Sequence, residues 1–263
     1  MLRLLLTFAI VSTFGRAVAQ EFWMESRKFL CRKGELVGIS FMASENFIDD
    51  KKAIDQGDLI ALDHHSLAGV SSLMDKLLDG STDALRITFA QDGTHLFSFQ
   101  TGRKPVPWEG EAFDNYLQAN GLEQALDQRI RSGIEASNTV EHVTQHGKLL
   151  IHVGDVSGSM FRKVTGHLLE IIPVNNPYLA GPGEELKFRI LYEGDPLPYS
   201  LVRVWNRKQD RVFVQRIYTE KDGTMTTRLS NDGIWMVSVV QINEMGTSGE
   251  WVSNRCTLVF GFE

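Results

Sequence analysis

Residues 185 to 262 form a series of short runs bounded by turn residues, and this series limits the fold more than any other feature. The runs are "ELKFRILYEG" (185–194), "SLVRVWNRK" (200–208), "RVFVQRIYTE" (211–220), "GTMTTRLS" (223–230), "GIWMVSVVQI" (233–242) and "RCTLVFGF" (255–262). About seven short strands in about 100 residues are typical of an immunoglobulin-like or transthyretin-like sandwich. We expect its core to contain Val202, Val204, Phe213 and Trp235.

Strand patterns also dominate the first part of the chain. "ELVGISFM" (35–42) and "GDLIALDHHS" (57–66) are rich in strand-forming residues, and "DALRITFA" (83–90) alternates apolar and polar positions. Asp92-Gly93 follows, and an Asp-Gly pair between two such runs is a strong hairpin signal because glycine accepts a positive φ. The sequence therefore predicts that 83–90 and 94–101 pair antiparallel.

The apolar spacing changes to that of a helix in 111–133, where Gly121 and Gly133 interrupt and end the pattern. We interpret this segment as two short amphipathic helices that cover a sheet edge, rather than as a binding helix. The polar stretch 157–166 then suggests a boundary. The prediction is an all-β protein of two β-sandwich domains, 20–160 and 161–263, with the helical insertion in the first.

The first 19 residues have the three parts of a secretory signal. Arg3 supplies the positive start, residues 4–14 are an uncharged apolar run, and Ala17-Val18-Ala19 gives small residues at a cleavage site. A membrane anchor is the alternative, but a span needs roughly 20 apolar residues and Arg16 ends this run. We expect a periplasmic or secreted protein that does not span the membrane once residues 1–19 are removed.

Cleavage after Ala19 would leave 244 residues with 25 Lys and Arg against 33 Asp and Glu, a net charge of −8. An acidic chain without a basic stripe argues against a nucleic-acid partner. The two cysteines, Cys31 and Cys256, lie near opposite ends of the mature chain. A disulfide and two buried thiols both remain open, since pairing requires Cα atoms within about 7 Å.

Several stretches resemble, in the same order, one bacterial family of exported proteins named domain of unknown function 4198. They are "EFWMESRKF", "GELVGISFMASENF", "GTHLFSFQ", "LEIIPVNNPY", "LYEGDPLPYSLVRVWNR", "YTEKDGTMTTRLSNDGIWMVSVV" and "LVFGF". The resemblance covers nearly all of the mature chain. It implies a relation to periplasmic components of nickel and cobalt uptake systems.

Members of this family usually begin the mature domain with Ala-His-Glu-Phe-Trp or Ala-His-Asp-Phe-Trp. A histidine at that position offers an imidazole, a ligand suited to Ni²⁺ or Co²⁺. This chain has Gln20 there, and a glutamine amide is a poor ligand for these ions. The departure removes the residue best able to hold the metal.

Other histidines are the remaining candidates for a nickel or cobalt site. His142 and His146 share a face of a helix or a strand, His146 and His152 share a face of a strand, and His95 follows the predicted hairpin turn. Glu141 offers a nearby oxygen ligand. The alternatives are a surface segment that carries histidines by chance and, for His95, a hydrogen-bonded structural histidine. His64 and His65 are adjacent and would point to opposite faces of a strand.

Trp108 lies in the proline-rich loop "PVPWEGE". Exposed, it would stack on a sugar or anchor a protein partner; buried, it would fill the seam between sheet and helices. No segment pairs a nucleophile with a base, so we expect no enzyme. The leading hypothesis is an exported accessory or binding protein linked to divalent metal uptake. The alternative is a structural module of the cell envelope that binds carbohydrate or a protein.

Overall fold

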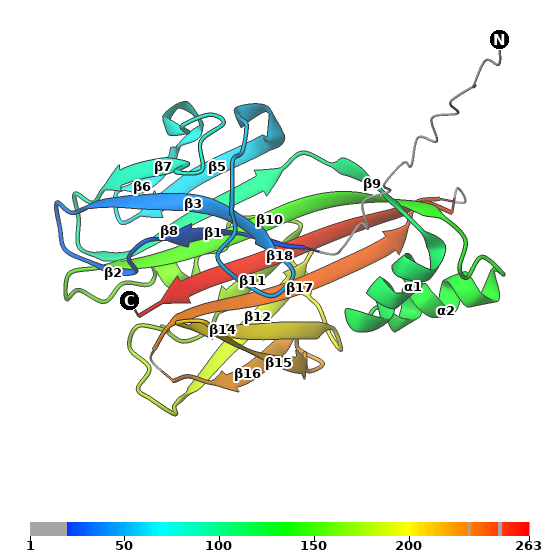
Figure 1. Ribbon diagram of the computed structural model, residues 1–263. Helices are drawn as coiled ribbons and strands as arrows, with labels where there is room; N and C mark the ends of the chain where they lie inside the picture. The colour runs from blue at the N-terminus through cyan, green and yellow to red at the C-terminus, as the bar shows by residue number, and fades with distance from the viewer. Residues whose placement is uncertain (1–19, 231, 247–248, 263) are drawn as a thin grey trace, which may run out of the picture.

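The computed structural model describes residues 20–230, 232–246 and 249–262. The predicted export signal, residues 1–19, lies outside this part of the chain. Strands dominate the described residues, which confirms the prediction of a mostly β protein (Figure 1).

A ten-stranded sheet, here called the central sheet, runs through the molecule. Its main path is β15 (Arg211–Tyr218), β14 (Leu201–Lys208), β17 (Ile234–Glu244), β18 (Trp251–Gly261), β10 (Thr139–Val153), β8 (Gly93–Thr101), β5 (Leu59–Ser66) and β6 (Gly69–Ser72). The short strands β2 (Leu30–Cys31) and β9 (Lys104–Trp108) also pair with β10. β10 and β18 are parallel neighbours, so the middle of the chain pairs with its C-terminal strand.

Two four-stranded sheets flank the central sheet. The N-terminal outer sheet contains β1 (Glu21–Ser26), β3 (Leu36–Ser44), β4 (Lys51–Lys52) and β7 (Leu85–Thr88). The C-terminal outer sheet contains β11 (Leu169–Pro173), β12 (Glu185–Tyr192), β13 (Asp195–Pro196) and β16 (Thr224–Arg228).

The outer sheets cover opposite faces of the central sheet. Along β10, Leu149 and Ile151 belong to the hydrophobic core under the N-terminal outer sheet, whereas Leu150 belongs to the core under the C-terminal one. Successive side chains of a strand point to opposite faces, so the three sheets form three layers. Burial on both faces explains why "KLLIHV" reads as a nearly continuous apolar run instead of an alternating one.

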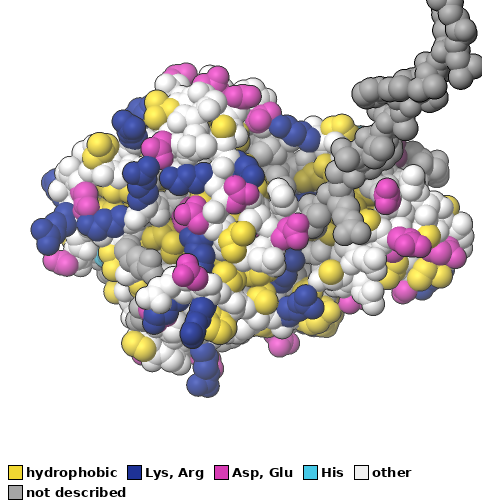
Figure 2. Space-filling model, in the orientation of Figure 1, with side chains coloured by type: hydrophobic (Ala, Val, Ile, Leu, Met, Phe, Trp, Pro, Cys, Tyr) yellow, Lys and Arg dark blue, Asp and Glu magenta, His cyan; other side chains and the backbone are white. Residues whose placement is uncertain are grey.

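A helical layer, α1 (Gly110–Ala119) and α2 (Glu123–Arg131), lies beyond the end of the N-terminal outer sheet (Figure 1). It packs on Val240 and Ile242 of β17, which share a strand face with Met236 of the N-terminal core. The helices therefore extend the same layer as the N-terminal outer sheet. Acidic side chains gather over this end of the molecule in Figure 2.

The remaining short elements are three 3₁₀ turns, at Gln56–Asp58, Met74–Lys76 and Met160–Arg162. None of the described helices combines the length and the apolar character that crossing a bilayer requires.

The central sheet includes strands from both predicted domains, and the N-terminal core takes in Trp205, Met236 and Val259 from the second. The helical insertion within 111–133 is confirmed. The division near residue 160 stays a prediction.

The predicted hairpin between 83–90 and 94–101 is wrong. β7 pairs with β3 of the N-terminal outer sheet, and β8 pairs with β5 and β10 of the central sheet. Gly93 does adopt a positive φ of 115°, but the turn carries the chain from one layer to another. The local turn signal predicts where the chain reverses direction. Which strands pair with β8 depends instead on the burial of both of its faces, which places it between β5 and β10.

Three of the four predicted core residues of the second part are buried: Val202, Val204 and Trp235. Phe213 is 60% exposed, so its assignment to the core is wrong. It lies near the start of β15, the last strand of the central sheet, whereas Gln215 and Ile217 further along the same face contact the C-terminal outer sheet and its core.

Cys31 and Cys256 are free and buried in cores on opposite faces of the central sheet. Burial raises the pKa of Cys31 to about 11 and that of Cys256 to about 12. The two thiols behave as small apolar groups.

Candidate functional site

A pocket of about 280 Å³ opens between the N-terminal outer sheet and strands β9, β10 and β18 of the central sheet; we call it the Arg255 pocket. Its apolar lining comes from Phe22, Ala43, Ala53, Ile54, Val106, Trp108 and Val143, and its polar lining from Gln20, Asp58, Thr101, Lys104, Gln145 and Arg255. Apolar walls with a few polar groups are typical of small-molecule sites.

Glu141 of β10 is not part of the lining, but it holds two residues that are, Trp108 and Arg255. Its side chain is 0% exposed and accepts hydrogen bonds from Trp108 Nε1 at 2.8 Å and Tyr116 Oη at 3.2 Å. Arg255 Nη2 donates to both carboxylate oxygens, at 3.0 and 2.8 Å. The carboxylate therefore ties β9, α1 and β18 together, and its charge is matched by the guanidinium.

Arg255 keeps one donor without a partner. Its Nε–H is buried and makes no hydrogen bond among the described residues, although Arg255 lines the pocket. Burial alone would lower its pKa, but Tyr116 and Glu141 raise it, so the guanidinium stays charged. A buried donor that makes no hydrogen bond costs about 1–3 kcal/mol of stability. An oxygen acceptor on a ligand would remove that cost.

The rim of the Arg255 pocket carries an ion pair. Lys104 Nζ lies 2.5 Å from Asp58 Oδ1, and both side chains are substantially exposed. Gln20, the first described residue, also lines the pocket. The position that the family resemblance gives to a histidine therefore lines this cavity.

Three of the histidine candidates share one face of β10 without converging. His142 Nε2 lies 2.8 Å from Glu250 Oε2, His146 Nε2 donates to Asn254 Oδ1 at 3.1 Å, and the His152 ring stacks on Tyr178. A strand rises about 3.3 Å per residue, so His142 and His146 stand about 13 Å apart along β10. The shared face that the spacing predicts exists, but the strand keeps the rings apart.

His95 lies on the opposite face of the central sheet. It pairs with Ile151 across β8 and β10, while His152 pairs with Thr94. Its Nε2 donates to Gln91 O at 2.9 Å, and its Nδ1 lies 2.8 Å from His64 Nε2. Both ring nitrogens are thus engaged.

The residues present do not fit a nickel or cobalt centre. Among the residues described, no three His, Cys, Asp or Glu side chains gather around a point that could hold a metal ion. The His146 and His167 rings lie 5.2 Å apart and each has a buried Nδ1 without a partner, which gives two nitrogen donors. With Gln20 at the position that the family resemblance gives to a histidine, residues 20–230, 232–246 and 249–262 do not supply a complete ligand set.

Trp108 is 5% exposed and stacks on Tyr116 with ring centroids 4.9 Å apart. Its indole fills the seam between the central sheet and the helices. Little ring surface remains for a sugar or a protein partner.

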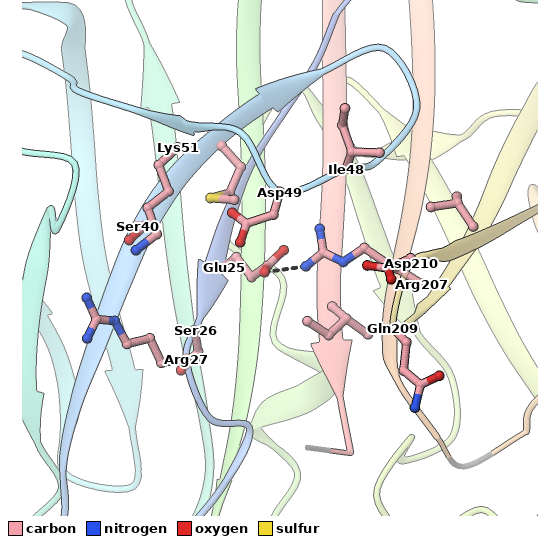
Figure 3. Close-up of a pocket in the computed structure, with 13 residues that line it drawn as sticks. Glu25, Ser26, Arg27, Ser40, Ile48, Asp49, Lys51, Arg207, Gln209 and Asp210 are labelled. Carbon is pink, nitrogen blue, oxygen red and sulfur yellow. Dashed lines mark hydrogen bonds and ion pairs between the residues drawn. The ribbon is translucent and has the colours of Figure 1, made fainter.

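A second pocket, of about 670 Å³, lies between β1, β3 and the β14–β15 hairpin. Figure 3 shows Glu25 and Arg207 joined inside it, and Arg207 also donates to Phe47 O. On the other wall, Arg27 is paired with Asp83. These charges are paired within the protein and join the layers. In the described part of the chain, no residue that lines this pocket has a buried donor without a partner, as Arg255 does.

The sequence reasoning missed Arg255 and the buried pair Lys148–Glu170. Lys148 Nζ lies 2.5 Å from Glu170 Oε1, and the side chains are 0% and 2% exposed. Burial raises the Glu170 pKa, but Lys148 and Thr165 outweigh it and the net shift is downward. Charged residues inside apolar strands, such as Lys148 in "GKLLIHV", were the signal for these positions.

Comparison with solved structures gives distant likenesses. Salmonella alpha-2-macroglobulin reacted with methylamine is 11% identical, with a TM-score of 0.23, over 94% of this chain and 15% of that one. Escherichia coli alpha-2-macroglobulin in its native conformation is 12% identical, with a TM-score of 0.22, over 93% of this chain and 14% of that one. The chain thus spans about 15% of the length of these proteins. Likenesses at these TM-scores carry no argument about function.

No curated protein matches the sequence. A family model does match residues 17–243, which is most of the chain and includes the pocket-lining strands β1, β3 and β9. The stretches that suggested a resemblance lie largely within this range. The chain belongs to the family described as domain of unknown function (DUF4198).

Proposed function

We propose that this chain is an exported, non-enzymatic binding protein of the cell envelope that holds a small ligand in the Arg255 pocket. The observation that carries the proposal is Arg255, a buried charged side chain that lines an apolar-walled pocket and whose Nε–H has no partner among the described residues. Export is supported by the signal pattern in residues 1–19. The proposal of a non-enzymatic role is supported by the sequence, in which no segment pairs a nucleophile with a base.

The ligand class follows from the lining. Arginine donates but does not accept hydrogen bonds, and Gln20, Gln145 and Lys104 add further donors. The apolar walls suit an apolar ligand body, and the volume lies just below the usual range for ligand sites. We therefore expect a small molecule with an apolar part and a carboxylate or carbonyl oxygen.

The first test is calorimetry on the mature chain, residues 20–263, with hexanoate and benzoate as probes. Arg255→Lys retains a positive charge beside Glu141 but removes the Nε donor. We expect the probes to bind the unchanged protein and to bind this variant about tenfold more weakly, a loss of about 1.4 kcal/mol. No heat with either probe would contradict the proposed ligand class.

A blocking variant tests the location of the site. Ala53 is exposed and lines the pocket, so Ala53→Trp should fill the mouth without disturbing the core. Ala68, exposed in the turn between β5 and β6, provides the matched control Ala68→Trp. Binding lost in the first variant and kept in the second supports the Arg255 pocket; equal binding in both places the ligand elsewhere.

The competing hypothesis is a role in nickel and cobalt uptake, which the family resemblance implies. The same calorimetry tests it. Ni²⁺ and Co²⁺ titrations would favour metal transport if they gave micromolar binding that His146→Ala weakened. We expect no such binding, because His146 has at most one neighbouring histidine nitrogen to share an ion with.

A further inference from the structure

The outer edge of β15 is the longest free strand edge of the central sheet. β15 ends the strand order on one side and has eight residues, whereas β6 ends the other side with four. Among the described residues, no backbone hydrogen bond joins β15 to an element other than β14. Natural sheets shorten or cover such edges because an open edge pairs readily with another strand.

The side chains of β15 are also unusually apolar for an exposed strand. Phe213, Val214 and Tyr218 are 60%, 45% and 51% exposed. An open edge with large apolar side chains on both faces is a surface for strand addition.

The backbone pattern shows which groups of β15 are free. Lys208 and Arg211 pair across the two-residue turn Gln209–Asp210, and the pair that closes such a turn normally exchanges both hydrogen bonds. Alternate residues then bond inward, so Val212, Val214, Arg216 and Tyr218 direct their N–H and C=O groups outward.

We propose that the chain forms a two-fold symmetric dimer in which β15 pairs antiparallel with β15 of a second copy, centred on Gln215. A two-fold axis normal to the sheet places opposite one another only residues that face the same side. Centring on Gln215 pairs Val212 with the second copy's Tyr218 and Val214 with its Arg216. All four outward-directed residues of each strand then find a backbone partner.

Side-chain chemistry favours the same register. Phe213 lies opposite the second copy's Ile217, and Val212 opposite its Tyr218, so apolar groups meet on both faces of the sheet. No arginine lies directly opposite another. Centring on Val214 would instead oppose Phe213 with Gln215 and Val212 with Arg216, and would leave Tyr218 facing the turn residue Asp210.

A cysteine at the axis tests the register. In the proposed dimer the two Gln215→Cys residues face each other in a close antiparallel pair, within disulfide reach. The native thiols are buried. Mild oxidation should crosslink this variant, whereas Phe213→Cys, about 13 Å from its own copy along the strand, should not crosslink. Crosslinking of Val214→Cys with none of Gln215→Cys would overturn the register.

A charge at the edge tests the interface itself. Val214→Lys would place an ammonium opposite the second copy's Arg216 and should weaken the dimer about tenfold or more, since like charges directly opposite are unfavourable. Val70 on β6 is 59% exposed, so Val70→Lys is the matched control. Light scattering over a concentration series should give a dimer for the unchanged chain and for Val70→Lys, and a shift toward monomer for Val214→Lys. A monomer at every concentration, or equal loss in both variants, would overturn the proposal.

Discussion

At the scale of single residues, His64 and His95 form a pair that is held neutral. The carbonyl oxygen of Gln91 is a pure acceptor, so His95 Nε2 carries the hydrogen and His95 Nδ1 accepts from His64 Nε2. The His64 ring also stacks on Phe97, with centroids 4.5 Å apart. Burial, with His95 nearby, lowers the His64 pKa from 6.5 to about 4.

This shift predicts a loss of stability in weak acid. Between pH 6.5 and about 4 the unfolded chain binds a proton at His64 that the folded chain does not, so stability rises with pH in this window. We expect His64 to account for about 2 kcal/mol of the decrease in unfolding free energy between pH 7 and pH 5. Urea unfolding at a series of pH values measures this decrease.

The variant His64→Gln identifies the contribution of this residue. It should flatten the dependence of unfolding free energy on pH by up to one proton. Burial also lowers the pKa of His146, which does not contact His64, so the contribution of His146 stays in place. If the curves of unfolding free energy against pH were parallel for the variant and the unchanged protein, His64 would make no contribution to the pH dependence.

At the scale of elements, one buried arginine fixes the helical layer. Arg129 of α2 is 1% exposed, donates from Nε to Asp114 Oδ1 of α1 at 2.6 Å and lies over the Phe113 ring. Asp114 Oδ2 also accepts from Ala136 N–H at 2.7 Å. The carboxylate therefore joins both helices to the segment that leads into β10.

Removing that carboxylate should loosen the layer. Asp114→Ala leaves the Arg129 charge buried and unpaired, and we expect a loss of about 3 kcal/mol in unfolding free energy. The matched control is Asp127→Ala, whose partner Arg131 lies 4.0 Å away with both side chains largely exposed, and we expect less than about 0.5 kcal/mol there. Urea unfolding followed by tryptophan fluorescence compares the two; similar losses would count against a special role for Asp114.

Elements were predictable to different degrees from the sequence. The helices within 111–133 carry their own periodicity and glycine stops, so local pattern was enough. The partners of β7 and β8 were not predictable, because the turn at Asp92-Gly93 is compatible with a hairpin and with a change of layer. Phe213 shows the same limit, since the alternation of β15 does not reveal that the strand ends the sheet.

At the scale of the whole molecule, the central sheet joins the two predicted domains. β10 pairs with β18 in parallel from Glu141↔Trp251 to Leu149↔Val259, and each core contains residues from before and after residue 160. Separating the two parts would expose this ladder and both cores.

We therefore expect the mature chain to unfold as one unit. Residues 20–160 and 161–263, produced separately, should lack a cooperative transition, whereas residues 20–263 should show one transition by circular dichroism and by fluorescence. Cooperative unfolding of either fragment at the midpoint seen in the whole chain would show that the parts are independent domains.

The candidate site shows the same division between local and distant information. His142 and His146 were recognisable from the sequence as shared-face positions, and Glu141 as a nearby oxygen ligand. Their distances from one another, the 108 residues that separate His146 from Asn254, and the contact between Glu141 and Arg255 depend on which strands become neighbours. No local pattern contains that information.

The sequence by itself determined the mostly β composition, the helical insertion and the family, because periodicity, turn residues and shared motifs are local properties. Only the tertiary structure decided that three sheets share a central layer, that Trp108 is covered and that Arg255 faces a pocket. These outcomes depend on pairing between strands far apart in the chain, which burial of both faces of β10 and β18 selects.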